Sequence, residues 1–305
     1  MKRTIPIFIF TLVLFSCNKP DKTPPIDDKI DLDGKIINDS SIVYPERFLQ
    51  SKRTLIPTDL EKKKRVYVCA HGFTASTFEW LEFRDFVEKE KNAFTSLVLL
   101  GGHGRDYEIF KNTTWQDWQK PIIDEVTSLM SLGYESIYLI GSSTGCPLIL
   151  DALKNSKLNS NVKGIYLIDP IIVPSTKTLS LINGVGPLLG YSESEMEKGE
   201  NGFWYKYRPY QSLIELNKIT QLVRSQLEKG INSSIPITVY KSIKDGSADP
   251  ISAPLIKKGI KGIIPSIKMI DSELHVFTRL KGRNTYLDKD LKNQETVFNE
   301  LLNKK

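Results

Sequence analysis

Short apolar runs alternate with helix-like periodicities from residue 65 to the C-terminus. Apolar runs of this kind, bounded by turn residues, predict buried strands. We expect six such strands, at Arg65–Ala70, Ser96–Leu100, Ser136–Ile140, Val162–Ile168, Ile235–Lys241 and Ile264–Ile270. Between the second and third strands, apolar side chains recur every three or four residues from Trp115 to Leu129, which predicts an amphipathic helix. Strands that alternate with helices indicate the α/β class, with a mostly parallel central sheet flanked by helices.

One segment, from about residue 174 to residue 234, interrupts this alternation and has no clear core strand. An insertion of that length in a compact fold is more typical of a lid than of a linker. The segment carries an aromatic cluster between Phe203 and Tyr210. We expect this cluster either to wall a substrate pocket or to form the small core of the lid itself.

The N-terminus has the pattern of an export signal over residues 1–16. Basic residues at positions 2 and 3 precede the apolar stretch Ile5–Phe15, which is too short to cross a bilayer as a helix. The stretch ends in Leu14-Phe15-Ser16-Cys17, which resembles the lipobox of bacterial lipoproteins. That resemblance implies cleavage before Cys17 and attachment of a lipid to it. The alternative is an ordinary signal peptide with a cysteine there by chance.

The residues that follow fit the lipoprotein interpretation. Residues 17–34 are rich in Lys, Asp and Pro, and they predict a solvated, lipidated tether ahead of a domain at 35–305. We therefore expect a protein of the bacterial cell envelope, held at the membrane through a lipid on Cys17.

Composition narrows the candidate functions. The chain has 305 residues and a formal net charge of +6, spread along its length rather than gathered in a basic stripe. With no zinc-finger spacing or RNA-binding signature either, we expect no nucleic-acid partner. Three histidines and no H-E-x-x-H pattern argue against a metal site. Cys69 and Cys146 are expected to be small buried hydrophobic residues, although export to an oxidising compartment leaves a disulfide as the alternative.

The residues Gly141-Ser142-Ser143-Thr144-Gly145 match the pattern G-x-S-x-G, with Ser143 at its centre. The motif directly follows an expected strand and opens an expected helix, which is the setting of a nucleophile elbow. Such a turn exposes the serine hydroxyl at a helix N-terminus, where developing negative charge is favoured.

A serine nucleophile needs a base and an acid. His275 is the only histidine after Ser143, so elimination leaves it as the base. Asp245, which follows the strand Ile235–Lys241, is the preferred acid, and Asp169 at the end of the preceding strand is its competitor. Asp249 is expected to cap the helix that begins near Pro250.

Taken together, these motifs resemble serine hydrolases of the α/β-hydrolase fold, in the branch of bacterial carboxylesterases and monoacylglycerol lipases. His71-Gly72-Phe73 resembles the oxyanion loop of that branch, and Gly102-His103-Gly104 resembles its G-H-G turn. The resemblance implies an α/β-hydrolase fold with a lid insertion. It also implies an oxyanion hole formed by the backbone N–H groups of Phe73 and Thr144, and it implies no cofactor. His71 and His103 are expected to brace their loops rather than to take part in the chemistry.

The expected function is ester hydrolysis of a small acyl-ester substrate through an acyl-enzyme on Ser143. An amidase, a thioesterase or a peptidase would use the same triad, because the shape of the acyl pocket decides among them. A non-catalytic binding lipoprotein that retains the fold is the third possibility.

Overall fold

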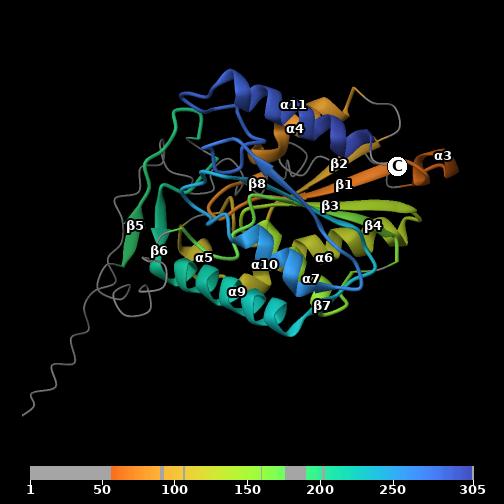
Figure 1. The fold of residues 1–305 in the computed structure, drawn as a ribbon, viewed down its shortest axis with the longest axis horizontal. Coiled ribbons are helices and arrows are strands. Elements are labelled where there is room, and N and C mark those ends of the chain that lie inside the picture. Colours follow the sequence, from red (N-terminus) through yellow and green to blue (C-terminus); the bar gives the residue numbers. More distant parts are fainter. Residues whose placement is uncertain are drawn as a thin grey trace, which may run out of the picture.

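The structure, a computed structural model, describes residues 56–89, 93–105, 107–158, 160–175, 190–200 and 203–303. A six-stranded sheet lies at the centre of the molecule, in the order β10-β8-β4-β3-β1-β2 (Figure 1). All of its neighbouring strands run parallel. The strands are β1 (Arg65–Ala70), β2 (Ala93–Val98), β3 (Ser136–Ser142), β4 (Val162–Ile168), β8 (Ile237–Ser242) and β10 (Ser266–Ile270). The expected α/β class and parallel sheet are confirmed.

The sheet contains the six expected strands, with small differences at their ends. The largest is in β2, which begins at Ala93 rather than Ser96. The expected strand started too late because the polar pair Thr95 and Ser96 separates Phe94 from the apolar run that follows. Thr95 nevertheless lies in register with Tyr67 of β1 and is buried. Burial on both faces, which is usual in parallel sheets, thus removes the alternation that marks a strand in sequence.

Helices cover both faces of the sheet (Figure 1). One face carries α4 (Leu81–Val87) and α11 (Asp288–Asn303) over a core that includes Phe83 and Phe298. The other face carries the larger core and the helices α5 (Tyr107–Lys111), α6 (Trp115–Ser131), α7 (Gly145–Lys154), α9 (Tyr210–Lys229) and α10 (Ser252–Gly259). The smaller elements are α3 (Asp59–Lys62), the 3-10 helix η1 (Thr77–Trp80), β5 (Tyr191–Glu193), β6 (Tyr207–Pro209), β7 (Ile231–Asn232) and β9 (Ile260–Lys261).

A pair of reciprocal hydrogen bonds caps the start of helix α6. The Thr114 hydroxyl accepts the backbone N–H of Asp117, and the Asp117 carboxylate accepts the backbone N–H of Thr114. This reciprocal cap satisfies two N–H groups that a helix start leaves without partners. The apolar stripe of α6, including Trp118 and Ile122, then packs against the sheet.

The segment expected to be a lid, from about 174 to 234, is described in part, because residues 176–189 and 201–202 lie outside the described residues. Its second half forms α9, whose residues Leu216, Ile219 and Val223 belong to the main core. This helix is part of the flanking layer rather than a cover over the site, since its buried face packs against α7 and α10. The strands β5 and β6 form an antiparallel pair ahead of α9. The lid itself stays a prediction.

The expected signal peptide at 1–16 and tether at 17–34 lie outside the described residues. Among the helices that are described, none combines the length and apolar character needed to span a bilayer.

Candidate active site

Ser143 lies in the sharp turn between β3 and α7, with a φ of 47°. This is the left-handed region, which is uncommon for residues other than glycine and is strained. The flanking glycines make the turn possible by allowing close packing. A Cβ on Gly145 would lie 2.6 Å from the carbonyl oxygen of Ala70, at the end of β1. The local sequence thus builds the expected elbow.

Two loops at the carboxyl end of the sheet bring partners to this serine. His275 follows β10, and its Nε2 lies 2.8 Å from Ser143 Oγ. Asp245 follows β8, and its Oδ2 lies 2.8 Å from His275 Nδ1. The three residues expected to act together therefore form one continuous hydrogen-bonded chain, which runs from a buried carboxylate to a serine at the elbow.

The Asp245 carboxylate is buried and strongly hydrogen-bonded. Burial by itself would raise its pKa, but the hydrogen bond with His275 and the charges of His275 and Lys241 outweigh burial and lower the pKa to about 2. Lys241 Nζ donates to Oδ2 at 2.5 Å, and the backbone N–H groups of Ser247 and Ala248 donate to Oδ1. An ionised carboxylate only accepts hydrogen bonds, so His275 donates through Nδ1 and leaves Nε2 to accept the Ser143 hydroxyl proton.

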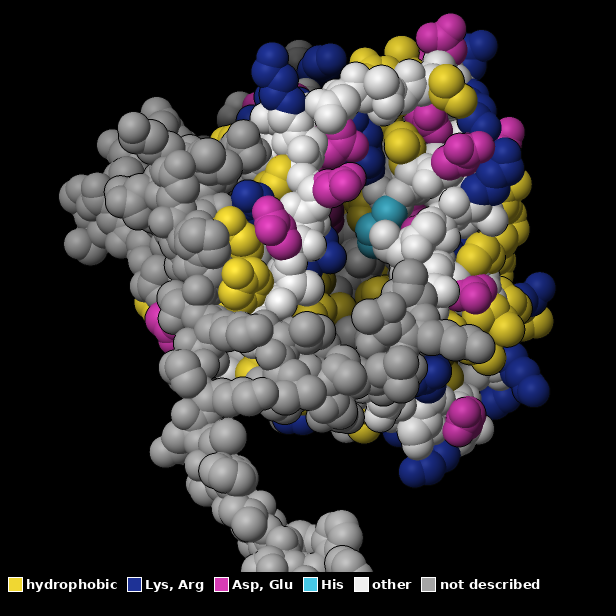
Figure 2. Space-filling model, turned by 90° about the vertical axis from the view of Figure 1, so that its left-hand side faces the viewer, with side chains coloured by type: hydrophobic (Ala, Val, Ile, Leu, Met, Phe, Trp, Pro, Cys, Tyr) yellow, Lys and Arg dark blue, Asp and Glu magenta, His cyan; other side chains and the backbone are white. Residues whose placement is uncertain are grey.

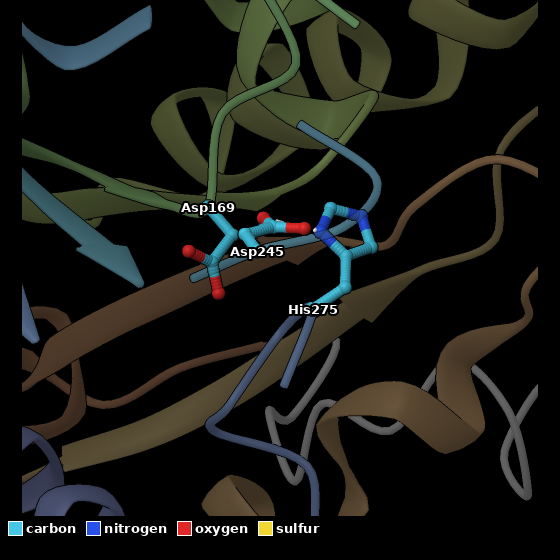
Figure 3. A group of neighbouring side chains, drawn as sticks. All are labelled: Asp169, Asp245 and His275. Carbon is cyan, nitrogen blue, oxygen red and sulfur yellow. Dashed lines mark hydrogen bonds and ion pairs between the residues drawn. The ribbon is translucent and has the colours of Figure 1, made fainter. Parts of the chain in front are cut away.

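Asp169, the competing acid, lies beside this group but faces other donors. Figure 3 shows the Asp245 carboxylate directed at the imidazole of His275 and the Asp169 carboxylate turned away from it. Asp169 instead accepts from the backbone N–H of Ser242 at 2.7 Å, from Lys241 Nζ at 3.2 Å and from the backbone N–H of Phe277 at 3.3 Å. Asp169 therefore links the end of β4 to the end of β8 and to the loop that carries His275.

Oxygen and nitrogen atoms of Asp169, Asp245 and His275 lie within 4.8 Å of one another, a spacing that can hold a metal ion. However, the Lys241 ammonium, which is fully buried, already donates to both carboxylates. A divalent cation there would meet a fixed positive charge and would compete with the Asp245–His275 hydrogen bond. The donor set therefore fits a lysine-stabilised carboxylate pair better than a metal centre.

The expected oxyanion groups lie on either side of the serine. Phe73 follows Gly72, and a Cβ on Gly72 would lie 3.0 Å from Ser143 Cβ, so this loop passes directly over the elbow. Thr144 follows Ser143 at the N-terminus of α7. Within the described residues, neither backbone N–H donates to another backbone carbonyl. Both are therefore available to a ligand oxygen.

Sequence reasoning missed Glu79, a carboxylate behind the site. It lies in η1 and is 5% exposed. Its Oε1 accepts the backbone N–H of Gly72 at 2.9 Å and the hydroxyl of Ser142. Burial raises the pKa of Glu79, and the Ser142 hydrogen bond and the nearby Arg279 charge offset part of that rise. Glu79 thus joins the Phe73 loop to the Ser143 turn. No local sequence pattern predicts this link.

His71 braces its loop as expected. The backbone N–H of Leu100 donates to His71 Nε2 at 3.1 Å, while Nδ1 lies 2.9 Å from the Gly72 carbonyl. These partners require a neutral ring that is protonated at Nδ1, and burial lowers the pKa of His71 to about 4. The ring of His103 packs edge-on against it at 5.1 Å and is also buried.

Ser143 and His275 open onto a cavity of about 250 Å³. Figure 2 shows a hollow with a histidine side chain inside it and with acidic and basic side chains around it. The aromatic cluster contributes Trp204 and Tyr205 to the cavity wall, whereas Phe203 stacks on Phe78 at 4.2 Å outside it. Trp204 and Tyr205 therefore lie in the wall of this cavity, whereas Phe203 packs on η1, outside the segment 174–234, rather than in a core of that segment's own.

Cys69 and Cys146 are both free and fully buried. Burial raises the pKa of each thiol well above its ordinary value, so neither is a reactive thiolate. The interpretation as small core residues is confirmed, and the alternative disulfide is absent between these two described cysteines.

No protein-family model matches this chain. Among curated proteins, the chain is similar to a thermostable monoacylglycerol lipase from a Bacillus species. The two are 25% identical over 215 residues, which cover 68% of this chain and 81% of that protein.

Solved structures of other proteins resemble this fold over most of the chain. The structure reported for the metagenome-derived lipolytic enzymes LipS and LipT has a TM-score of 0.64 at 19% identity, covering 79% of this chain and 93% of that one. Monoglyceride lipase from Saccharomyces cerevisiae has a TM-score of 0.63 at 12% identity, covering 83% and 88% of the two chains. At these identities the likeness concerns the fold, and it agrees with the strand order and the elbow described above: this chain has the α/β-hydrolase fold.

Proposed function

We propose that this protein is a serine hydrolase that cleaves carboxylic esters. The observation that carries the proposal is the hydrogen-bonded chain from Asp245 through His275 to Ser143, with both linking distances at 2.8 Å. This arrangement activates a serine, whose hydroxyl is a weak nucleophile until a base takes its proton. The similarity to a monoacylglycerol lipase and to lipolytic enzymes favours esters over amides or thioesters.

In the first half of the reaction, Ser143 Oγ attacks the ester carbonyl carbon while His275 Nε2 takes the hydroxyl proton. The carbonyl oxygen becomes an oxyanion and accepts hydrogen bonds from the N–H groups of Phe73 and Thr144, each worth roughly 3 kcal/mol in the transition state. The intermediate then collapses, the alcohol leaves with the proton from His275, and the acyl group stays on Ser143 as an ester.

In the second half, water attacks the acyl-enzyme, and His275 again acts first as base and then as acid. The free acid leaves and the Ser143 hydroxyl is restored. Asp245 holds the imidazole in the reactive tautomer throughout and stabilises its charged form. Because Lys241 and two backbone N–H groups keep Asp245 ionised, this role does not require the carboxylate to gain a proton.

The proposal is tested with a fluorophosphonate probe and a chain-length series of p-nitrophenyl esters. We expect the wild type to be labelled on Ser143, as read by peptide mass, and to hydrolyse at least the shorter esters. Ser143→Ala should abolish labelling and lower kcat by at least about 10⁴-fold, because the nucleophile is lost while the fold is kept. Undiminished labelling of Ser143→Ala, or no labelling of the wild type, would favour a non-catalytic binding protein.

We also propose that the hydrolase is a lipoprotein of the bacterial cell envelope. Support comes from the basic start, the apolar stretch and the Leu14–Cys17 pattern. Cys17→Ala should move the protein from the membrane fraction to the soluble fraction of lysed cells, without changing its esterase activity. A Cys17→Ala protein that stays with the membranes contradicts the lipid anchor.

A further inference from the structure

Among the described residues, three arginines line the cavity beside Ser143, and two of them have carboxylate partners. Arg279 pairs with Glu200 at 2.6 Å and lies over the ring of Trp204. Arg283 lies 3.9 Å from Glu197 and donates to the carbonyl oxygens of His275 and Val276. These two arginines hold the cavity wall together.

The third, Arg208, has no carboxylate partner within the part of the chain that the structure describes. It projects from β6, and its Nη2 donates to the hydroxyl of Ser194 at 2.6 Å, a neutral acceptor that also lines the cavity. Its Nε is buried and makes no hydrogen bond, and within the described part of the chain no carboxylate lies within 4.0 Å of it. Burial lowers the pKa of Arg208, and attraction to Glu200 offsets only part of that effect.

The acidic groups of the cavity wall are engaged elsewhere. Glu200 pairs with Arg279 and also accepts the backbone N–H of Glu197. The Glu79 carboxylate accepts hydrogen bonds from the backbone N–H of Gly72 and from the hydroxyl of Ser142. Glu195 is exposed to solvent. Arg208 is therefore the cavity arginine whose charge has no carboxylate partner among the described residues.

We propose that Arg208 binds a negatively charged oxygen group of the substrate, so that the preferred esters carry a carboxylate or a phosphate-type group at a distance from the scissile bond. A guanidinium matches such groups because its N–H donors form a planar fork. A partly buried arginine without a carboxylate beside it is stabilised by an anionic ligand, which supplies the missing negative charge. At about 250 Å³ the cavity suits a compact ester.

This inference rests on the proposed esterase activity and deepens it. The test compares three substrates of equal chain length: p-nitrophenyl hexanoate, the p-nitrophenyl half-ester of adipic acid, and the counterpart with a phosphonate in place of the distal carboxylate. For each enzyme, the readout is kcat/KM for a charged ester divided by kcat/KM for the neutral one. The charged ester with the higher ratio identifies which anion the site prefers.

We expect this ratio to exceed one in the wild type and to fall about tenfold or more in Arg208→Gln, since hydrogen bonds between charged groups are stronger than those between neutral ones. Arg208→Lys should retain part of the preference, because it keeps the charge and loses the fork. The control is Arg224→Gln, on α9 in a separate cavity with Leu227 and Lys258, which should leave the ratio unchanged.

A ratio near one for both charged esters in the wild type would overturn the role of Arg208, as would an equal loss on all three esters in Arg208→Gln. Both results require measurable hydrolysis of the neutral ester by the wild type, so they arise only where the proposed function holds; failure of that function would appear instead as no hydrolysis of any of the three esters. If Arg208→Gln does not fold, inhibition of the wild-type enzyme tests the site instead. Competitive inhibition of ester hydrolysis by adipate but not by hexanol supports the anion site. Equal inhibition by the two compounds contradicts it.

Discussion

At the scale of single residues, the arrangement around His275 assigns different tasks to two neighbouring aspartates. Asp245 accepts a hydrogen bond from the imidazole N–H. Asp169 instead accepts hydrogen bonds from Ser242, Lys241 and Phe277. Both carboxylates share the buried ammonium of Lys241, so the loss of either changes the charge balance of the group. Their contributions to turnover and to stability should nevertheless separate.

Asp245→Asn should lower kcat for ester hydrolysis by about 10⁴-fold, because the neutral amide no longer enforces the reactive tautomer of His275. Asp169→Asn should mainly lower the free energy of unfolding, by about 1–3 kcal/mol, because its hydrogen bonds are structural. Initial rates on a p-nitrophenyl ester and urea denaturation measure the two effects. If kcat collapses in Asp169→Asn and survives in Asp245→Asn, the roles are reversed.

At the scale of elements, the candidate oxyanion hole is divided between the loop after β1 and the turn before α7. Glu79 in η1 is the side chain that joins them, through the N–H of Gly72 and the hydroxyl of Ser142. Gly72 directly precedes the proposed oxyanion donor Phe73, and Ser142 directly precedes the nucleophile Ser143. Glu79 is therefore a positioning residue that keeps the two halves at a constant separation.

Glu79→Ala should lower kcat by about 10- to 100-fold with a smaller change in KM, since misplaced donors weaken the transition state more than substrate binding. Glu79→Gln, which retains a carbonyl acceptor for Gly72, should recover most of the loss. Steady-state kinetics with one ester, together with thermal melts, distinguish this from a general loss of fold. Equal activity of Glu79→Ala and wild type would show that the two halves hold their places without the carboxylate.

At the scale of the whole molecule, buried neutral histidines link stability to pH. His71 stays neutral in the folded state because burial lowers its pKa to about 4, and burial holds the pKa of His103 well below its ordinary value as well. In the unfolded chain both rings take up a proton near pH 6.5. Their contribution to stability is therefore complete above about pH 6.5 and is lost as the pH falls toward 4.

The free energy of unfolding, measured by urea denaturation between pH 8 and pH 4, should thus decline by roughly 3 kcal/mol from His71 alone. A His71→Asn variant should start from lower stability, because the Leu100 N–H loses its acceptor, and should show a shallower decline. A wild-type curve as flat as that of the variant would mean that His71 is protonated in the folded protein.

The sequence by itself determined the features that depend on neighbouring residues. Apolar runs specified all six strands of the sheet, and the apolar periodicity from Trp115 to Leu129 specified α6. The glycines at 141 and 145 marked the elbow, because a Cβ would bring Gly141 too close to the start of α7 and Gly145 too close to the end of β1. Chain order also singled out His275, as the sole histidine downstream of Ser143.

The tertiary structure decided what depends on contacts between distant segments. It placed Asp245 rather than Asp169 against His275, a histidine 132 positions from the serine that it contacts. It assigned α9 to the flanking layer, and it revealed the link through Glu79 and the lack of a carboxylate partner for Arg208 among the described residues. Strand and turn preferences are local, whereas hydrogen bonds and ion pairs follow from three-dimensional proximity, which residue spacing along the chain does not encode.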